Sequence, residues 1–122
     1  MPTAINLDTH IVIDGLLGKL RPREARLIRR HPIGISGIVL WEMARLRQKG
    51  RITLSPDDPQ LLEWLGRVTI WPVDLEVCRK LAQLDFHSDP ADELIAATSL
   101  AHRAPLLTRD SRIRRSRKVP LA

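Results

Sequence analysis

The sequence predicts an α/β fold in which a central parallel sheet is covered by helices on both faces, a three-layer α/β/α sandwich. Short apolar strand patterns alternate with helical patterns along the chain, as in folds built from strand–helix–strand units. The longest helical pattern is apolar around most of its circumference, which indicates a helix buried between layers. With 122 residues, 43% of them hydrophobic, the chain is expected to form one domain spanning residues 1–122.

Strand and helix patterns follow one another through the whole chain. Short apolar runs predict strands at residues 4–7, 33–35, 68–73 and 105–107, and a last short strand near Val119. Helical spacing of apolar side chains predicts helices at residues 10–17, 22–31, 36–49, 57–65, 74–81 and 91–103. Residues at the boundaries support these limits. Gly18 and Gly50 follow helices, where a left-handed backbone is common. Pro22 suits a first helical turn, and Ser36 and Asp89 are expected helix N-caps.

Composition argues against a membrane or secreted protein. There is no run of eighteen apolar residues, so we expect no membrane-spanning helix. Residues 1–7 lack the charged start and long apolar stretch of a signal peptide. Cys78 is the only cysteine, so no internal disulfide can form and a reducing compartment, the cytoplasm, is expected. On its helix Cys78 is expected to be a core residue.

Positive charge is concentrated in two stretches that hold twelve of the twenty Lys and Arg residues. The first contains Lys19, Arg21, Arg23, Arg26, Arg29 and Arg30, and the second contains Arg109, Arg112, Arg114, Arg115, Arg117 and Lys118. Such clustering, with a net charge of +6, is typical of surfaces that bind a phosphate backbone. A solvated basic face that only maintains solubility is the other interpretation.

Two aspartates stand at the carboxyl ends of predicted strands. Asp8 follows the strand at 4–7, and Asp110 follows the strand at 105–107. Because open parallel sheets bind ligands beyond the carboxyl ends of their strands, both acids are expected at one functional edge. Taken singly, each is better explained as a helix cap or turn residue.

Two further acids lie on helix faces that are otherwise apolar. Glu42 shares its face with Val39 and Leu46, where a carboxylate costs free energy unless it is paired or holds a metal. A salt bridge to Arg45 is the alternative. Asp92 lies in the first turn of the longest helix, although the helix dipole alone favours an acid there by about 0.3 to 1 kcal/mol.

The order of these acids, with the segments around them, forms a pattern that covers the chain from Leu7 to about Ile113. The segments are Leu7-Asp8-Thr9-His10, Ile35-Ser36, Trp41-Glu42-Met43, Gly50-Arg51-Ile52, Asp89-Pro90-Ala91-Asp92, Leu94-Ile95-Ala96-Ala97 and Leu106-Leu107-Thr108-Arg109-Asp110. In this order and spacing the chain resembles the PIN-domain nucleases, and most closely the VapC-type toxins of bacterial toxin–antitoxin pairs.

The resemblance implies a PIN-like fold and a pocket that holds Mg²⁺ or Mn²⁺. Matched position by position, Asp8, Glu42, Asp92 and Asp110 correspond to the acidic quartet of the family, and Thr108 corresponds to its supporting hydroxyl. Asp8, Asp92 and Asp110 are then the expected metal ligands, while Glu42 positions or deprotonates the attacking water or completes a second metal site. The implied activity is hydrolysis of RNA phosphodiesters.

The resemblance also implies an RNA substrate, an antitoxin protein as partner, and a homodimer. Two positions depart from the family pattern. Glu93 stands where many relatives have a basic residue, and the tail after Asp110 is short and very basic.

Electrostatics supports a metal ion independently. Two carboxylates about 4 Å apart repel by roughly 4 kcal/mol at an effective dielectric near 20, so four cannot all stay ionised around an empty pocket. Hard oxygen ligands select Mg²⁺ or Mn²⁺ over Zn²⁺. The four histidines are scattered, and only His87 is expected near the acids.

Two other classes of protein remain open at this stage. A non-catalytic nucleic-acid-binding module on a degenerate PIN-like fold has the same basic stretches but needs no metal. A phosphoacceptor receiver domain also places acids at strand ends. It is expected to carry a lysine beyond a late strand, where this chain has Arg109 and a basic tail.

Overall fold

A four-stranded parallel sheet forms the centre of the computed structural model, which describes residues 3–122. The strands are β1 (Ile5–Leu7), β2 (Ile33–Ser36), β3 (Thr69–Trp71) and β4 (Leu106–Leu107). Their order across the sheet is β3-β2-β1-β4, so the first strand lies in the interior of the sheet. Ile5, Leu7 and Ile35 are almost fully buried, as expected for strands covered on both faces.

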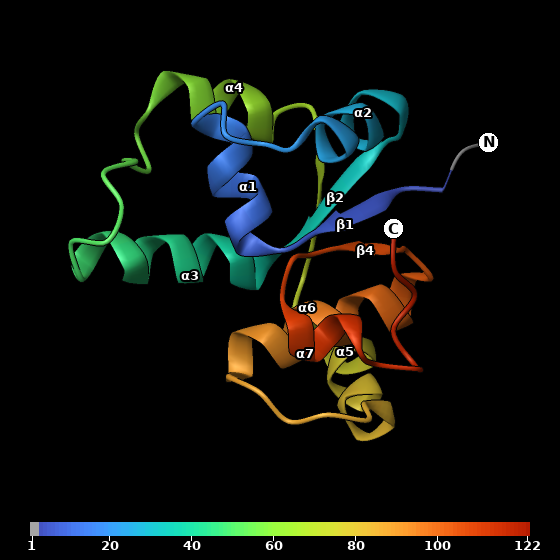
Figure 1. Ribbon diagram of the computed structural model, residues 1–122. Helices are drawn as coiled ribbons and strands as arrows, with labels where there is room; N and C mark the ends of the chain where they lie inside the picture. The colour runs from blue at the N-terminus through green and yellow to red at the C-terminus, as the bar shows by residue number, and fades with distance from the viewer. Residues whose placement is uncertain (1–2) are drawn as a thin grey trace.

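Helices cover both faces of this sheet (Figure 1). One side carries α1 (Thr9–Leu16), α2 (Pro22–Arg30) and α4 (Pro59–Leu65). The other side carries α5 (Leu75–Lys80), α6 (Pro90–His102) and α7 (Ser111–Arg114), with a short 3-10 turn at Leu81–Gln83. The remaining helix, α3 (Gly37–Gln48), follows β2 and packs against α1 and α6. The predicted three-layer α/β/α architecture is confirmed. None of the helices in residues 3–122 has the length and apolarity needed to cross a membrane.

The helix boundaries follow the capping residues that the sequence indicated. The Ser36 hydroxyl accepts a hydrogen bond from the Ile38 backbone N–H at 3.2 Å, which caps α3. Asp89 is the N-cap of α6, although its side chain makes no capping hydrogen bond. The predicted strand near Val119 is reduced to a single parallel bridge between Leu106 and Leu121.

The prediction that Cys78 belongs to the core is wrong, because its side chain is exposed. Helix α5 has only six residues and buries only one of them, Val77. Successive helical residues are rotated by about 100°, so the position after Val77 turns toward solvent. Size and apolarity alone did not indicate which face of this short helix is buried.

A buried amide attaches α6 to β1. Asn6 is fully buried, and its Nδ2 donates hydrogen bonds to the Ile95 carbonyl at 3.0 Å and to Ser99 Oγ at 2.9 Å. Asp8 lies two residues beyond Asn6, directly after β1. Asp92 lies about one turn before Ile95 in α6. The Asn6 amide therefore fixes the relative position of two of the acids.

A close contact between β2 and the Trp71 ring gives the first testable prediction. A Cβ atom on Gly34 would lie 2.3 Å from the ring, so Gly34→Ala is expected to lower the free energy of unfolding by about 1 to 3 kcal/mol. Urea denaturation measures this change. In a Trp71→Ala background the same substitution should cost much less, and an equal cost in both backgrounds would show that the ring contact is not the cause.

Candidate active site

Five acidic residues border one pocket of about 260 Å³: the four acids of the predicted pattern and Asp89, the N-cap of α6. The pocket is lined by Asp8, His10, Ile11, Glu42, Asp89, Asp92, Arg109 and Asp110. All four members of the acidic pattern therefore lie around a single space, and they reach it from β1, α3, α6 and the end of β4.

The topology of the sheet explains why these acids meet. Strands β1 and β4 are adjacent and parallel, with Leu7 opposite Leu107, so the residues that follow them emerge at the same edge. Helix α3 starts directly after β2, the neighbour of β1 on its other side, and carries Glu42 to this edge. Helix α6, held through Asn6, supplies Asp92.

Thr108 connects two of the acids. Its hydroxyl donates to Asp8 Oδ2 at 2.6 Å and accepts from the Asp110 backbone N–H at 3.0 Å. Asp8 is 5% exposed, and its Oδ1 accepts from the Thr9 backbone N–H at 2.8 Å. Asp110 Oδ1 accepts from two backbone N–H groups of α7. Both aspartates are thus helix caps and pocket residues at once, so the two interpretations of each do not exclude one another.

Asp92 is the acid whose ionisation is most perturbed. Its pKa is raised to about 6, chiefly by burial and additionally by the negative charges of Asp8, Glu42 and Asp110. A hydrogen bond from the Ser88 hydroxyl to Asp92 Oδ2, at 2.8 Å, opposes this shift. The other three carboxylates are therefore close enough for Asp92 to experience their charge.

The salt bridge considered for Glu42 is absent. Within residues 3–122 Glu42 takes part in no ion pair. The Arg45 guanidinium instead lies over the Trp41 ring, 5.5 Å from its centroid. Among the described residues, no Lys, Arg or His side chain therefore lies within ion-pair distance of the Glu42 carboxyl group.

The histidine beside the acids is His10, and the expectation for His87 is wrong. The His87 side chain is fully exposed and lies 3.9 Å from Glu93, outside the pocket lining. His10 follows the strand-end acid Asp8 by two residues, which is the signal that the sequence offered for it. The Ser88 hydroxyl, which contacts Asp92, had no comparable signal.

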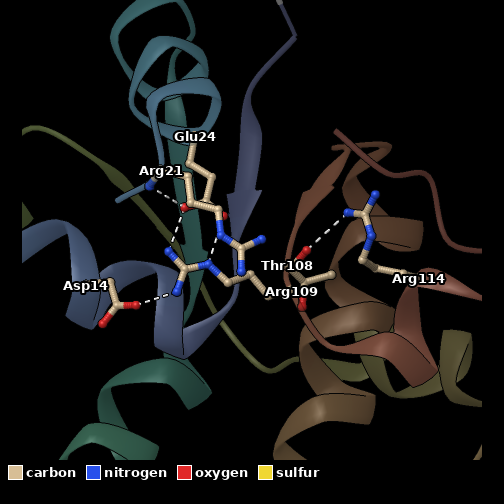
Figure 2. A network of polar contacts seen from close by, with 6 residues as sticks. All are labelled: Asp14, Arg21, Glu24, Thr108, Arg109 and Arg114. Atoms are coloured by element: carbon tan, nitrogen blue, oxygen red, sulfur yellow. Dashed lines mark hydrogen bonds and ion pairs between the residues drawn. The ribbon is translucent and has the colours of Figure 1, made fainter. Parts of the chain in front are cut away.

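Arg109 also borders the pocket, but its guanidinium group is paired with two carboxylates that do not line the pocket (Figure 2). Its guanidinium contacts Asp14 Oδ2 at 2.5 Å and both carboxylate oxygens of Glu24, at 2.8 and 2.6 Å. These bonds lower the pKa of Glu24 to about 2 and raise the pKa of Arg109. The sequence indicated Arg109 as one of the phosphate-binding charges, whereas the structure gives it two carboxylate partners.

The donor set fits a hard divalent cation. The acids of the pocket offer only carboxylate oxygens, and Mg²⁺ and Mn²⁺ prefer such ligands. In the described part of the chain no three Asp, Glu, His or Cys side chains already stand in a metal-coordinating arrangement. The four carboxylates would therefore have to draw closer together to hold an ion.

Comparison with known proteins agrees with this architecture. The model of the PIN domain family matches residues 5–119. Similar solved structures include VapBC2 from Rickettsia felis bound to a DNA fragment from its promoter (20% identity, TM-score 0.75) and a toxin–antitoxin complex from Klebsiella pneumoniae (20% identity, TM-score 0.71). In both cases the similarity covers 98% of this chain and 97% of the other. No curated protein sequence matches the chain.

Proposed function

This chain belongs to the PIN-domain family, and from that membership we propose that it is an endoribonuclease that hydrolyses RNA phosphodiesters with Mg²⁺ or Mn²⁺. The observation that carries the proposal is the convergence of Asp8, Glu42, Asp92 and Asp110 on one pocket. The family match removes the receiver-domain alternative. The non-catalytic binding module remains the competing function.

Each acid has a distinct proposed role. Asp8, Asp92 and Asp110 are the side chains that would hold the ion, which when bound supplies a Lewis acid that activates water and offsets charge on the phosphate. Glu42, which has no ion-pair partner in residues 3–122, orients the attacking water and accepts its proton, or completes a second metal site. The water oxygen bonds to phosphorus, the bond to one ribose oxygen breaks, and that oxygen takes up a proton.

The test of this function is cleavage of a single-stranded RNA oligonucleotide by the purified chain. Cleavage is expected with Mn²⁺ or Mg²⁺, and none is expected with EDTA. Mn²⁺ should also raise the melting temperature, because a ligand that binds only the folded state stabilises it. If Mn²⁺ leaves the melting temperature unchanged, and the chain binds the RNA without cleaving it in a way that Asp92→Asn does not alter, the non-catalytic module is the correct function.

Thr108→Val tests the supporting role of the hydroxyl. The substitution keeps the shape of the side chain but removes the hydrogen bond to Asp8 and the acceptor for the Asp110 backbone N–H. Loss of such a supporting hydrogen bond is expected to weaken Mn²⁺ binding by about 10- to 100-fold. Calorimetric titration of Mn²⁺ without RNA measures it. Thr108→Ser, which retains the hydroxyl, is the matched control, and equal affinities in all three proteins would contradict the role.

The solved structures that resemble this chain include VapBC2 from Rickettsia felis and a toxin–antitoxin complex from Klebsiella pneumoniae. On this ground we propose that the chain is a toxin with an antitoxin protein as partner, and that it forms a homodimer.

Expression of the chain alone should arrest bacterial growth, and Asp8→Ala should relieve the arrest. Harmless expression of a folded and active enzyme would contradict the toxin role. Sedimentation of the purified chain tests the dimer.

A further inference from the structure

A second pocket, of about 420 Å³, lies beside the pocket that Asp8, Glu42, Asp92 and Asp110 border. Its lining consists of Arg21, Arg23, Glu24, Leu107, Thr108, Arg109 and Arg114. Arg109 lines both pockets. Thr108 also links them, because its hydroxyl donates to Asp8 while its carbonyl accepts a hydrogen bond from the Arg114 guanidinium at 3.2 Å. We refer to this space as the arginine pocket.

The arginine pocket contains positive charge that the protein does not neutralise. Its only carboxylate, Glu24, has both oxygens bound by Arg109. Within residues 3–122 the other three guanidinium groups, from Arg21, Arg23 and Arg114, form no ion pair. Three unpaired cations around one concave space attract an anion, and guanidinium groups match the geometry of phosphate oxygens.

The fold brings both basic stretches of the sequence to this pocket. Arg21 and Arg23 lie at the start of α2, whereas Arg114 is the last residue of α7. Figure 2 shows the Arg21 and Arg114 side chains on either side of Thr108. Of the twelve basic residues in those stretches, only these three and Arg109 line the pocket. The pocket therefore gathers a particular subset of the basic residues, which a uniformly basic surface would not do.

The neighbouring acids explain why a cationic pocket is needed here. Four carboxylates repel a phosphodiester strand that approaches them, and adjacent cations offset this repulsion. We propose that the arginine pocket binds a backbone phosphate next to the scissile phosphate of a single-stranded nucleic acid, an inference that rests on the proposed ribonuclease function. The three arginines are substrate-positioning residues. An acidic protein segment is the other anion that such a pocket accepts, and the experiment separates the two.

The experiment compares two triple variants that remove equal charge. R21Q/R23Q/R114Q empties the arginine pocket of its unpaired cations. R26Q/R29Q/R115Q removes three exposed arginines of the same stretches that line neither pocket. Binding of a fluorescent ten-nucleotide oligouridylate is measured in EDTA at two salt concentrations. The pocket triple is expected to bind at least tenfold more weakly than the control triple, and its salt slope should fall by about 0.7 for each lost phosphate contact.

Several outcomes would overturn the proposal. Equal weakening in both triples would mean that only general charge attracts the nucleic acid. Binding of decaglutamate, a model of an acidic protein segment, is measured in the same way. If the pocket triple loses affinity for decaglutamate but not for oligouridylate, the pocket is a protein-binding site. If the pocket triple does not fold, Arg114→Gln is compared with Arg115→Gln, with a loss of at least threefold expected for the former only.

Cleavage measurements separate this proposal from the proposed function. With Mn²⁺ the pocket triple is expected to raise KM at least tenfold more than it lowers kcat. If wild type cleaves RNA and both triples have the same KM, the phosphate subsite is wrong and the nuclease function stands. If wild type does not cleave RNA but the two triples differ in binding, the nuclease function is wrong and the phosphate-binding pocket stands.

Discussion

Asp92→Asn is expected to stabilise the metal-free protein near neutral pH and to reduce RNA cleavage on the order of a thousandfold. The pKa of Asp92 is raised from 3.8 to about 6, so ionisation of this group opposes folding. Between these two values the folded protein holds more protons at Asp92 than the unfolded chain does, and stability therefore falls as the pH rises. The full shift corresponds to roughly 3 kcal/mol, which partial solvent exposure reduces to about 1 to 2 kcal/mol.

The predicted loss of activity has a separate cause. A bound metal contributes several kcal/mol of charge stabilisation in the transition state, and each 1.36 kcal/mol corresponds to about a tenfold rate. Removal of one proposed ligand should therefore produce a loss of about this size. The same substitution thus has opposite effects on stability and on catalysis, which a simple folding defect cannot do.

Thermal unfolding across a pH series measures the effect on stability. The gain in melting temperature of Asp92→Asn over wild type should be present above about pH 6 and should disappear below about pH 4. Mn²⁺ should raise the melting temperature of wild type more than that of the variant. Asp57→Asn, at an exposed position outside the pocket, is the matched control and should behave as wild type. A gain that is independent of pH would show that the Asp92 charge is not the cause.

The elements that the sequence predicted well are those with strong local signals. Helices α2, α3 and α6 have clear apolar spacing and residues such as Pro22 and Ser36 at their starts, and these signals act within a few residues. The failures concern short elements. Strand β3 ends at Trp71, before Pro72, because proline has no N–H for the ladder, so Val73 lies outside the strand. Cys78 lies on a six-residue helix whose period is too short to define a buried face.

The placement of the acids followed from topology, whereas their partners did not. Parallel strands end at one edge, so Asp8 and Asp110 could be placed together from strand assignments alone. The bonds from Arg109 to Asp14 and Glu24 join residues 95 and 85 positions apart, and nothing local to any of the three indicates the pairing. A carboxylate at position 24 has a sufficient local explanation as an acid in the first turn of α2, which concealed its longer-range role.

Arg109→Gln is expected to lower the free energy of unfolding by about 2 to 4 kcal/mol at neutral pH. Removing one partner of a buried pair leaves the other charge buried and uncompensated, which typically costs about 3 to 5 kcal/mol. The expected value is slightly lower here because the Arg109 side chain is 28% exposed, although that of Glu24 is only 7% exposed. In wild type the pKa of Glu24 lies at about 2, below its ordinary value of 4.5. The pair therefore stabilises the fold above about pH 4.5, and this contribution is lost as the pH falls toward 2.

Urea denaturation at neutral and acid pH measures the free energy of unfolding of Arg109→Gln, of a control variant and of a double variant. The difference between wild type and Arg109→Gln should shrink at low pH, because protonated Glu24 no longer needs a cation. Arg115→Gln, an exposed arginine of the same basic stretch, should change stability by less than about 0.5 kcal/mol. The double variant Glu24→Gln/Arg109→Gln should recover part of the loss, because it removes the stranded charge together with its partner. If the double variant is no more stable than Arg109→Gln, the cost comes from lost packing of the arginine stem and not from an unpaired carboxylate.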